Sequence, residues 1–177
     1  MPRGEPVPIV SVVGRKNSGK TTLVEALVRE LSRRGHRVGT IKHDAHGFEI
    51  DHEGKDSWRH KRAGAETVVI ASASKVAMVM VKSVTADPGP YALASTLLGD
   101  MDIIIAEGYR KLGRHRVEVV CSATGAPPLC AEDEVIAFVS DARPSAIVPC
   151  FGIEEIGSLA DMLEQKLLSS APISSLP

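Results

Sequence analysis

The run GRKNSGKT, residues 14–21, has the residue types and spacing of a phosphate-binding turn, G-x-x-x-x-G-K-[ST]. In such a turn the glycines let the backbone curl until successive N–H groups point inward. The helix expected to begin near Lys20 adds unpaired N–H groups and the positive end of its dipole. One dipole contributes only about 0.3–1 kcal/mol, whereas micromolar nucleotide binding requires roughly 8 kcal/mol, so several donors and Lys20 must act together. The sequence therefore predicts a site for a nucleoside triphosphate.

Two side chains of this turn have specific expected roles. The Lys20 ammonium would reach the β- and γ-phosphates, and the Thr21 hydroxyl would bind Mg²⁺. The candidate nucleotide-binding residues of the turn are Gly14, Lys16, Asn17, Ser18, Gly19, Lys20, Thr21 and Thr22.

The run MDIIIAEG, residues 101–108, is an apolar segment that ends in an acid and a glycine. Ligands of open α/β sheets gather at the carboxyl ends of the strands, so we expect Glu107 to face the phosphate turn. Its carboxylate would hold Mg²⁺, directly or through water, or position an attacking water. We identify no glutamine or arginine in the sequence as a catalytic finger, so we expect any hydrolysis to be slow.

Histidines and aspartates are concentrated in the segment IKHDAHGFEIDHEGKDSWRHKRAGA, residues 41–65. Their spacing matches no standard zinc signature. Three interpretations stay open: a loop that lines the nucleotide, a loop that lines a second substrate, and an ordinary polar surface. Under the first, Asp44 is a candidate Mg²⁺ ligand and Asp51 a candidate catalytic carboxylate, together with Lys20 and Glu107.

A further acid ends a late strand in VIAFVSDARP, residues 135–144. An aspartate there can select guanine, because its carboxylate accepts hydrogen bonds from the ring N1–H and the exocyclic amine. The sequence contains no N-K-x-D motif, and a helix or turn cap explains Asp141 equally well.

These residues require a scaffold of alternating strands and helices. Strand-like runs occupy residues 6–13, 36–42, 67–72, 75–81, 101–107, 116–122 and 134–140, and helical patterns cover residues 20–34, 55–65, 90–99 and 154–170. The alternation predicts an α/β fold with a largely parallel sheet flanked by helices. The runs 67–81 and 116–122 lack intervening helices, so we expect an antiparallel strand extension there, with an exposed edge that favours dimerisation.

Composition narrows the class of protein. The chain has 177 residues and a formal net charge of −1, which favours neither nucleic-acid nor membrane binding. The amino terminus lacks the apolar run of a signal peptide, and three cysteines show no metal-ligand spacing, so we expect a cytoplasmic protein. We predict a single nucleotide-binding domain over residues 1–170 and a flexible tail over residues 171–177.

Five blocks of the sequence together resemble the MobB family, which acts in molybdopterin-guanine dinucleotide biosynthesis. They are GRKNSGKTTL, IKHDAH, DHEGKDSWRHKRAGA, IIIAEGYR and VIAFVSD. The phosphate turn is shared by many NTPases, whereas the ordered set G-K-D-S, A-G-A and E-G-[FY]-[KR] is much more specific.

The resemblance implies a homodimeric P-loop protein that binds GTP and Mg²⁺ and has weak GTPase activity. It also implies that the protein assists a partner nucleotidyltransferase in attaching GMP to molybdopterin, itself a candidate ligand. Carried over, residues 14–22 would bind the phosphates, Thr21 the Mg²⁺, and Glu107 would be the acid of the second NTPase motif. The loop from His43 to Asp56 would lie near the γ-phosphate or the pterin, and Asp141 is the candidate for guanine.

Two other functions use the same phosphate turn. In a small-molecule kinase, Lys55 and Arg59 would hold the acceptor. In a non-hydrolysing scaffold, the nucleotide would be structural.

Overall fold

The computed structural model describes residues 6–44, 47–81, 88–142 and 147–169. The chain forms two compact units: the sheet unit, which contains the segments before Asp44 and after Asp87, and the hairpin unit, Asp44–Asp87. The prediction of one domain over residues 1–170 stays a prediction, because each unit is described by itself. The predicted tail, residues 171–177, lies outside the described residues.

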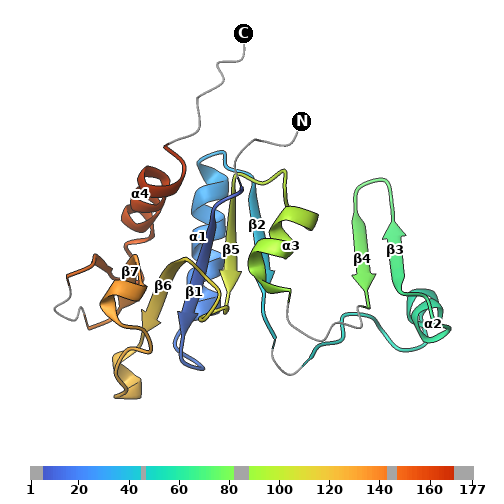
Figure 1. Ribbon diagram of the computed structural model, residues 1–177, viewed down its shortest axis with the longest axis horizontal. Coiled ribbons are helices and arrows are strands. Elements are labelled where there is room, and N and C mark those ends of the chain that lie inside the picture. Colours follow the sequence, from blue (N-terminus) through green and yellow to red (C-terminus); the bar gives the residue numbers. More distant parts are fainter. Residues whose placement is uncertain (1–5, 45–46, 82–87, 143–146, 170–177) are drawn as a thin grey trace, which may run out of the picture. The chain divides into compact units, whose positions relative to one another are not determined.

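The sheet unit contains a parallel sheet with strand order β2-β5-β1-β6-β7-β8. Figure 1 labels its first five strands. Among the described residues its six strands are β1 Ile9–Gly14, β2 Val38–Lys42, β5 Ile103–Glu107, β6 His115–Val120, β7 Ala137–Ser140 and β8 Cys150–Phe151. Parallel strands align their carboxyl ends at one edge of the sheet, and β1, β5, β6 and β7 end there in Gly14, Glu107, Val120 and Ser140. The prediction of an α/β fold with a largely parallel sheet is confirmed.

Helices cover both faces of this sheet. Helices α1 Lys20–Arg33 and α4 Ile156–Leu167 pack on one face, around an apolar cluster that contains Val10, Ile105 and Val139. Helix α3 Gly89–Leu97 contributes Ala94 to a second cluster with Ile104 on the opposite face. The strands are buried from both sides, which explains their nearly continuous Val and Ile content.

Helix α1 follows the phosphate turn and has one apolar stripe. Leu23, Leu27 and Leu31 recur every four residues and are completely buried against the sheet. Burial of one such side chain stabilises the fold by about 1.5–3 kcal/mol, so the stripe holds the start of the helix firmly at the sheet edge. The chain leaves the helix at Gly35, whose φ of +94° few other residues adopt.

The sequence prediction for β6 was wrong. We expected residues 116–122 in an antiparallel extension, but β6 pairs parallel with both β1 and β7 and is not an edge strand. Residues 108–114 cross over β1 without a helix, through a turn in which the backbone N–H groups of Leu112 and Gly113 donate to the Tyr109 carbonyl oxygen at 3.2 Å and 2.8 Å. Gly113 makes the close passage feasible, since a Cβ there would collide with the Ser11 side chain.

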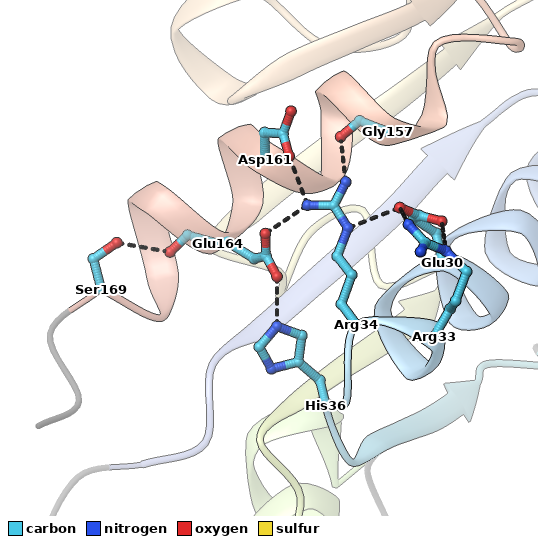
Figure 2. A network of polar contacts seen from close by, with 8 residues as sticks. All are labelled: Glu30, Arg33, Arg34, His36, Gly157, Asp161, Glu164 and Ser169. Carbon is cyan, nitrogen blue, oxygen red and sulfur yellow. Dashed lines mark hydrogen bonds and ion pairs between the residues drawn. The ribbon is translucent and has the colours of Figure 1, made fainter. Parts of the chain in front are cut away.

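A polar network joins the carboxyl end of α1 to α4 (Figure 2). The Arg34 guanidinium donates to Glu30 at 2.8 Å, to Asp161 at 2.6 Å and to Glu164 at 2.6 Å. Hydrogen bonds from Arg33 and Arg34 lower the pKa of the Glu30 carboxyl from its ordinary value of 4.5 to about 2. The network therefore holds the last turn of α1 against α4 by charge-assisted hydrogen bonds.

The hairpin unit contains helix α2 Asp56–Arg62 and the antiparallel strands β3 Thr67–Ala71 and β4 Val76–Met80. This confirms the hairpin predicted over residues 67–81. The Ser72 hydroxyl closes the turn by accepting from the backbone N–H of Lys75 at 3.1 Å. Val68 faces inward and is 8% exposed. The opposite side of the hairpin exposes large apolar side chains: Val69, Val76, Met78 and Met80.

No helix in the described parts of the chain is both long enough and apolar enough to cross a membrane.

Candidate functional site

The phosphate turn lies between β1 and α1, at the carboxyl edge of the sheet. Its backbone has left-handed φ angles at Asn17 and Gly19, and Gly14 has a φ of +146°. A Cβ on Gly14 would lie 2.6 Å from the Val119 carbonyl oxygen and 2.7 Å from the Ser18 Oγ. Glycine is therefore required there, because a side chain would fill the space in which the turn curls.

The start of α1 is open to an anion. Gly19 provides no side-chain cap, and the first helical turn carries no acidic residue, so its N–H groups and dipole are available to a phosphate. The Lys20 Nζ donates to the Arg15 carbonyl oxygen at 2.6 Å and so lies across the turn. The turn residues with exposed side chains are Arg15, Lys16, Asn17, Thr21 and Thr22, and Ser18 is buried.

Thr21 and Glu107 meet across the sheet edge, although 86 residues separate them. The Thr21 Oγ1 donates to the two carboxylate oxygens of Glu107, at 3.1 Å and 3.2 Å. A hydroxyl and a carboxylate beside a phosphate turn are the hard oxygen ligands that Mg²⁺ prefers. The described residues contain no group of three or more His, Cys, Asp or Glu arranged to hold a metal. Thr21 and Glu107 could hold Mg²⁺, and a bound triphosphate and water could supply further oxygen ligands.

The carboxylate of Asp141 lies beyond the end of β7 and already has partners. Its Oδ1 accepts from the Ser122 backbone N–H at 2.8 Å, and its Oδ2 accepts from the Ser122 hydroxyl at 2.7 Å. These hydrogen bonds lower the pKa of the Asp141 carboxyl. The sequence drew attention to Asp141 but not to Ser122, because a serine in a loop has no distinctive pattern.

Sequence reasoning also missed Tyr109 beside Glu107, whereas His43 begins the loop predicted to lie near the γ-phosphate or the pterin. The His43 backbone N–H donates to the Glu107 carbonyl oxygen at 3.0 Å, and the rings of His43 and Tyr109 lie 4.7 Å apart. Tyr109 has a φ of +57°, a strained conformation for an aromatic residue. The EGY run that follows β5 was the available signal, since a glycine after a strand end permits such a sharp turn.

Asp44 and Asp51 belong to the hairpin unit, which is described by itself. The Asp51 Oδ1 accepts from the Ser57 hydroxyl at 2.8 Å. Its Oδ2 is buried and has no hydrogen-bond partner within the described residues. The predicted roles of both aspartates stay predictions.

The parallel sheet, the phosphate turn between β1 and α1, and the acid at the end of the adjacent β5 define a P-loop NTPase-like protein. The family model for "Molybdopterin guanine dinucleotide synthesis protein B", MobB, matches residues 9–141. The chain belongs to the MobB family, and the resemblance read from its motifs is confirmed.

Individual relatives agree with this assignment. The chain is 34% identical over 169 residues to the molybdopterin-guanine dinucleotide biosynthesis adapter protein of Haemophilus influenzae, with 91% of this chain and 90% of the relative covered. It is 29% identical to the Escherichia coli adapter protein, with 89% and 91% covered. The crystal structure of Bacillus subtilis MobB matches with a TM-score of 0.69 at 25% identity, with 90% of this chain and 98% of that chain covered.

Proposed function

We propose that this protein binds GTP with Mg²⁺ at the phosphate turn, hydrolyses it slowly, and acts as an accessory in molybdopterin-guanine dinucleotide biosynthesis. Membership of the MobB family supports the role in this biosynthetic pathway. The main support for binding of GTP with Mg²⁺ is the contact between Thr21 and Glu107, which pairs a hydroxyl and a carboxylate beside the open start of helix α1.

Different residues of the site would bind different parts of the triphosphate. The turn's N–H groups and the amino end of α1 would hold the phosphate oxygens, and Lys20 would leave the Arg15 carbonyl for the β- and γ-phosphates. Thr21 and Glu107 would hold Mg²⁺, with Asp44 as a further candidate ligand. When bound, Mg²⁺ neutralises charge that develops on the transferring phosphoryl group.

Asp51 is the proposed carboxylate that orients the attacking water. Its Oδ1 accepts from the Ser57 hydroxyl and the His52 backbone N–H, and its Oδ2 is buried without a hydrogen-bond partner among the described residues. The attacking water would have to enter beside Oδ2 to use this acceptor. Alignment by a carboxylate alone supplies little charge stabilisation, so slow turnover is expected.

The test of the nucleotide site is calorimetric titration of GTP in Mg²⁺ against wild type, Lys20→Ala and Lys166→Ala. Lys20→Ala should weaken binding at least tenfold, since it removes the ammonium aimed at the phosphates. Lys166→Ala, a change of equal charge in α4, should leave binding unchanged. Unchanged affinity in Lys20→Ala would exclude this site.

The fate of the γ-phosphate separates the proposal from its rivals. Labelled GTP should release free phosphate slowly, and Glu107→Gln should abolish the release. A phosphorylated pterin would identify a kinase instead, and no release even with the partner nucleotidyltransferase present would identify a scaffold.

We further propose a cytoplasmic homodimer that contacts the nucleotidyltransferase and has molybdopterin as a candidate ligand. The support for a dimer is the exposed apolar side of the hairpin, formed by Val69, Val76, Met78 and Met80, because apolar strands without cover favour association. Light scattering at tens of micromolar should give the mass of two chains. A monomer in wild type, or a dimer that survives Val69→Lys with Met78→Lys, would contradict this interface.

A further inference from the structure

Two loops occupy the carboxyl edge of the sheet on the side of β1 away from Glu107. The strand order places β6 and then β7 on that side. The segment Cys121–Cys130, which we call the base loop, follows β6, and Asp141 follows β7. A nucleotide whose phosphates lie on the turn, with Mg²⁺ toward Glu107, would reach these two loops with its base if it extends away from the metal.

The base loop is fastened to the phosphate turn. The Arg15 guanidinium donates to the Pro127 carbonyl oxygen, from Nη2 at 3.2 Å and from Nε at 3.4 Å. Arg15 and Ser18 of the turn and Cys121 and Thr124 of the loop line one cavity of only about 10 Å³. Such a volume accommodates about one water molecule, so the two segments are closely packed.

Ser122 holds the Asp141 carboxylate at both oxygens. Its backbone N–H and its hydroxyl donate at 2.8 Å and 2.7 Å. The paired contacts prevent rotation of the carboxylate and favour its ionised form. The Ser140 side chain and the Asp141 backbone also interact with this carboxylate, so its orientation is set from several sides. The side chains of Ser122 and Asp141 are both exposed and accessible to a base.

We propose that Ser122 is a positioning residue for guanine recognition, which acts by holding the Asp141 carboxylate toward the base. This inference rests on the proposed binding of GTP. Guanine presents two coplanar donors, the ring N1–H and the exocyclic amine, and an oriented carboxylate accepts from both. Adenine presents an acceptor at N1, which a carboxylate repels. A carboxylate that rotates freely loses conformational entropy when a base binds. Loss of the Ser122 contacts should therefore weaken the contribution of Asp141 to the affinity for guanine nucleotides.

The test uses GTP, ITP and ATP, titrated with Mg²⁺ by calorimetry. Inosine lacks the exocyclic amine, so the ratio of GTP to ITP affinity reports the bond from that amine to Asp141. Wild type should bind GTP about tenfold more tightly than ITP, which corresponds to a difference of roughly 1.4 kcal/mol in binding free energy. Ser122→Ala should reduce this preference to about threefold or less, with ATP affinity unchanged. Ser122→Thr keeps the hydroxyl and should restore the preference, with melting temperatures confirming that both variants are folded.

The outcomes separate this inference from the proposed function. An unchanged GTP to ITP ratio in Ser122→Ala, with wild type selective, would overturn the role of Ser122 alone. A raised ratio would show that Ser122 competes with the base and would also overturn it. If wild type bound GTP and ATP equally, the guanine role of Asp141 would fall together with that of Ser122. If wild type bound neither nucleotide, the proposed function itself would fail.

Discussion

A buried carboxylate in β6 holds the far end of the base loop. Glu118 is 1% exposed, and its two oxygens accept from the backbone N–H groups of Leu129 at 2.5 Å and Cys130 at 2.9 Å. The substitution Glu118→Gln keeps the shape but replaces one oxygen by an NH₂ group. Whichever way the amide faces, one backbone N–H then meets another donor.

The cost of this change follows from the two hydrogen bonds. A hydrogen bond to a charged group contributes about 1.5–3 kcal/mol, and a buried N–H left without an acceptor costs about 1–3 kcal/mol. Removal of a buried charge offsets part of this loss. We expect a net decrease of about 3 kcal/mol in the free energy of unfolding. For a chain of this size, the melting temperature should fall by about 6–12 °C.

Urea unfolding, followed by circular dichroism, measures this decrease. The matched control is Glu134→Gln: this glutamate accepts from the Ala131 backbone N–H at 2.9 Å, but its side chain is 47% exposed. Its loss should cost less than about 1 kcal/mol, because water replaces the lost partner. Equal decreases for the two variants would refute the reasoning. The base loop of Glu118→Gln should also become sensitive to protease, whereas that of the control should not.

Two other predictions concern the turn and α1. Gly14→Ala should abolish measurable GTP binding in calorimetry, because its Cβ would lie 2.6 Å from a backbone carbonyl oxygen of β6. Gly35→Ala, which meets no atom within 4 Å, should cost stability through its positive φ but leave binding unchanged. The Glu30 carboxyl, whose pKa Arg33 and Arg34 lower from 4.5 to about 2, stabilises the fold fully above pH 4.5, and this contribution is lost as the pH falls toward 2. Arg34→Met removes one of the two arginines, so the urea midpoint of this variant should fall less than that of wild type as the pH is lowered across that range.

The phosphate side of the site was predictable because its signals are local. The glycine and lysine spacing, the strand before it and the apolar stripe after it all lie within residues 8–31. Glu107 could be predicted as a site residue from one rule of fold geometry, namely that ligands of parallel sheets bind at the carboxyl ends of the strands. The contact between Thr21 and Glu107 follows when both rules hold together.

Glu118 shows where the sequence gives no such signal. An acid within RVEVVCS suggests a strand position that faces solvent, since glutamate is seldom buried without partners. Its burial depends on two N–H groups that lie 11 and 12 residues later in an irregular loop. No periodicity reports a loop that folds back onto a strand, so this residue became recognisable only in the structure.

The wrong direction predicted for β6 and the failure to predict Ser122 have one cause. An antiparallel β6 would carry Ser122 to the opposite edge of the sheet, away from Asp141 and from the phosphate turn. The crossover of residues 108–114 makes β6 parallel, so the ends of β6 and β7 reach the same edge, and Ser122 meets Asp141 there. The base selection that we propose would therefore depend on a short connection over β1, in which a Cβ on Gly113 would collide with the Ser11 side chain.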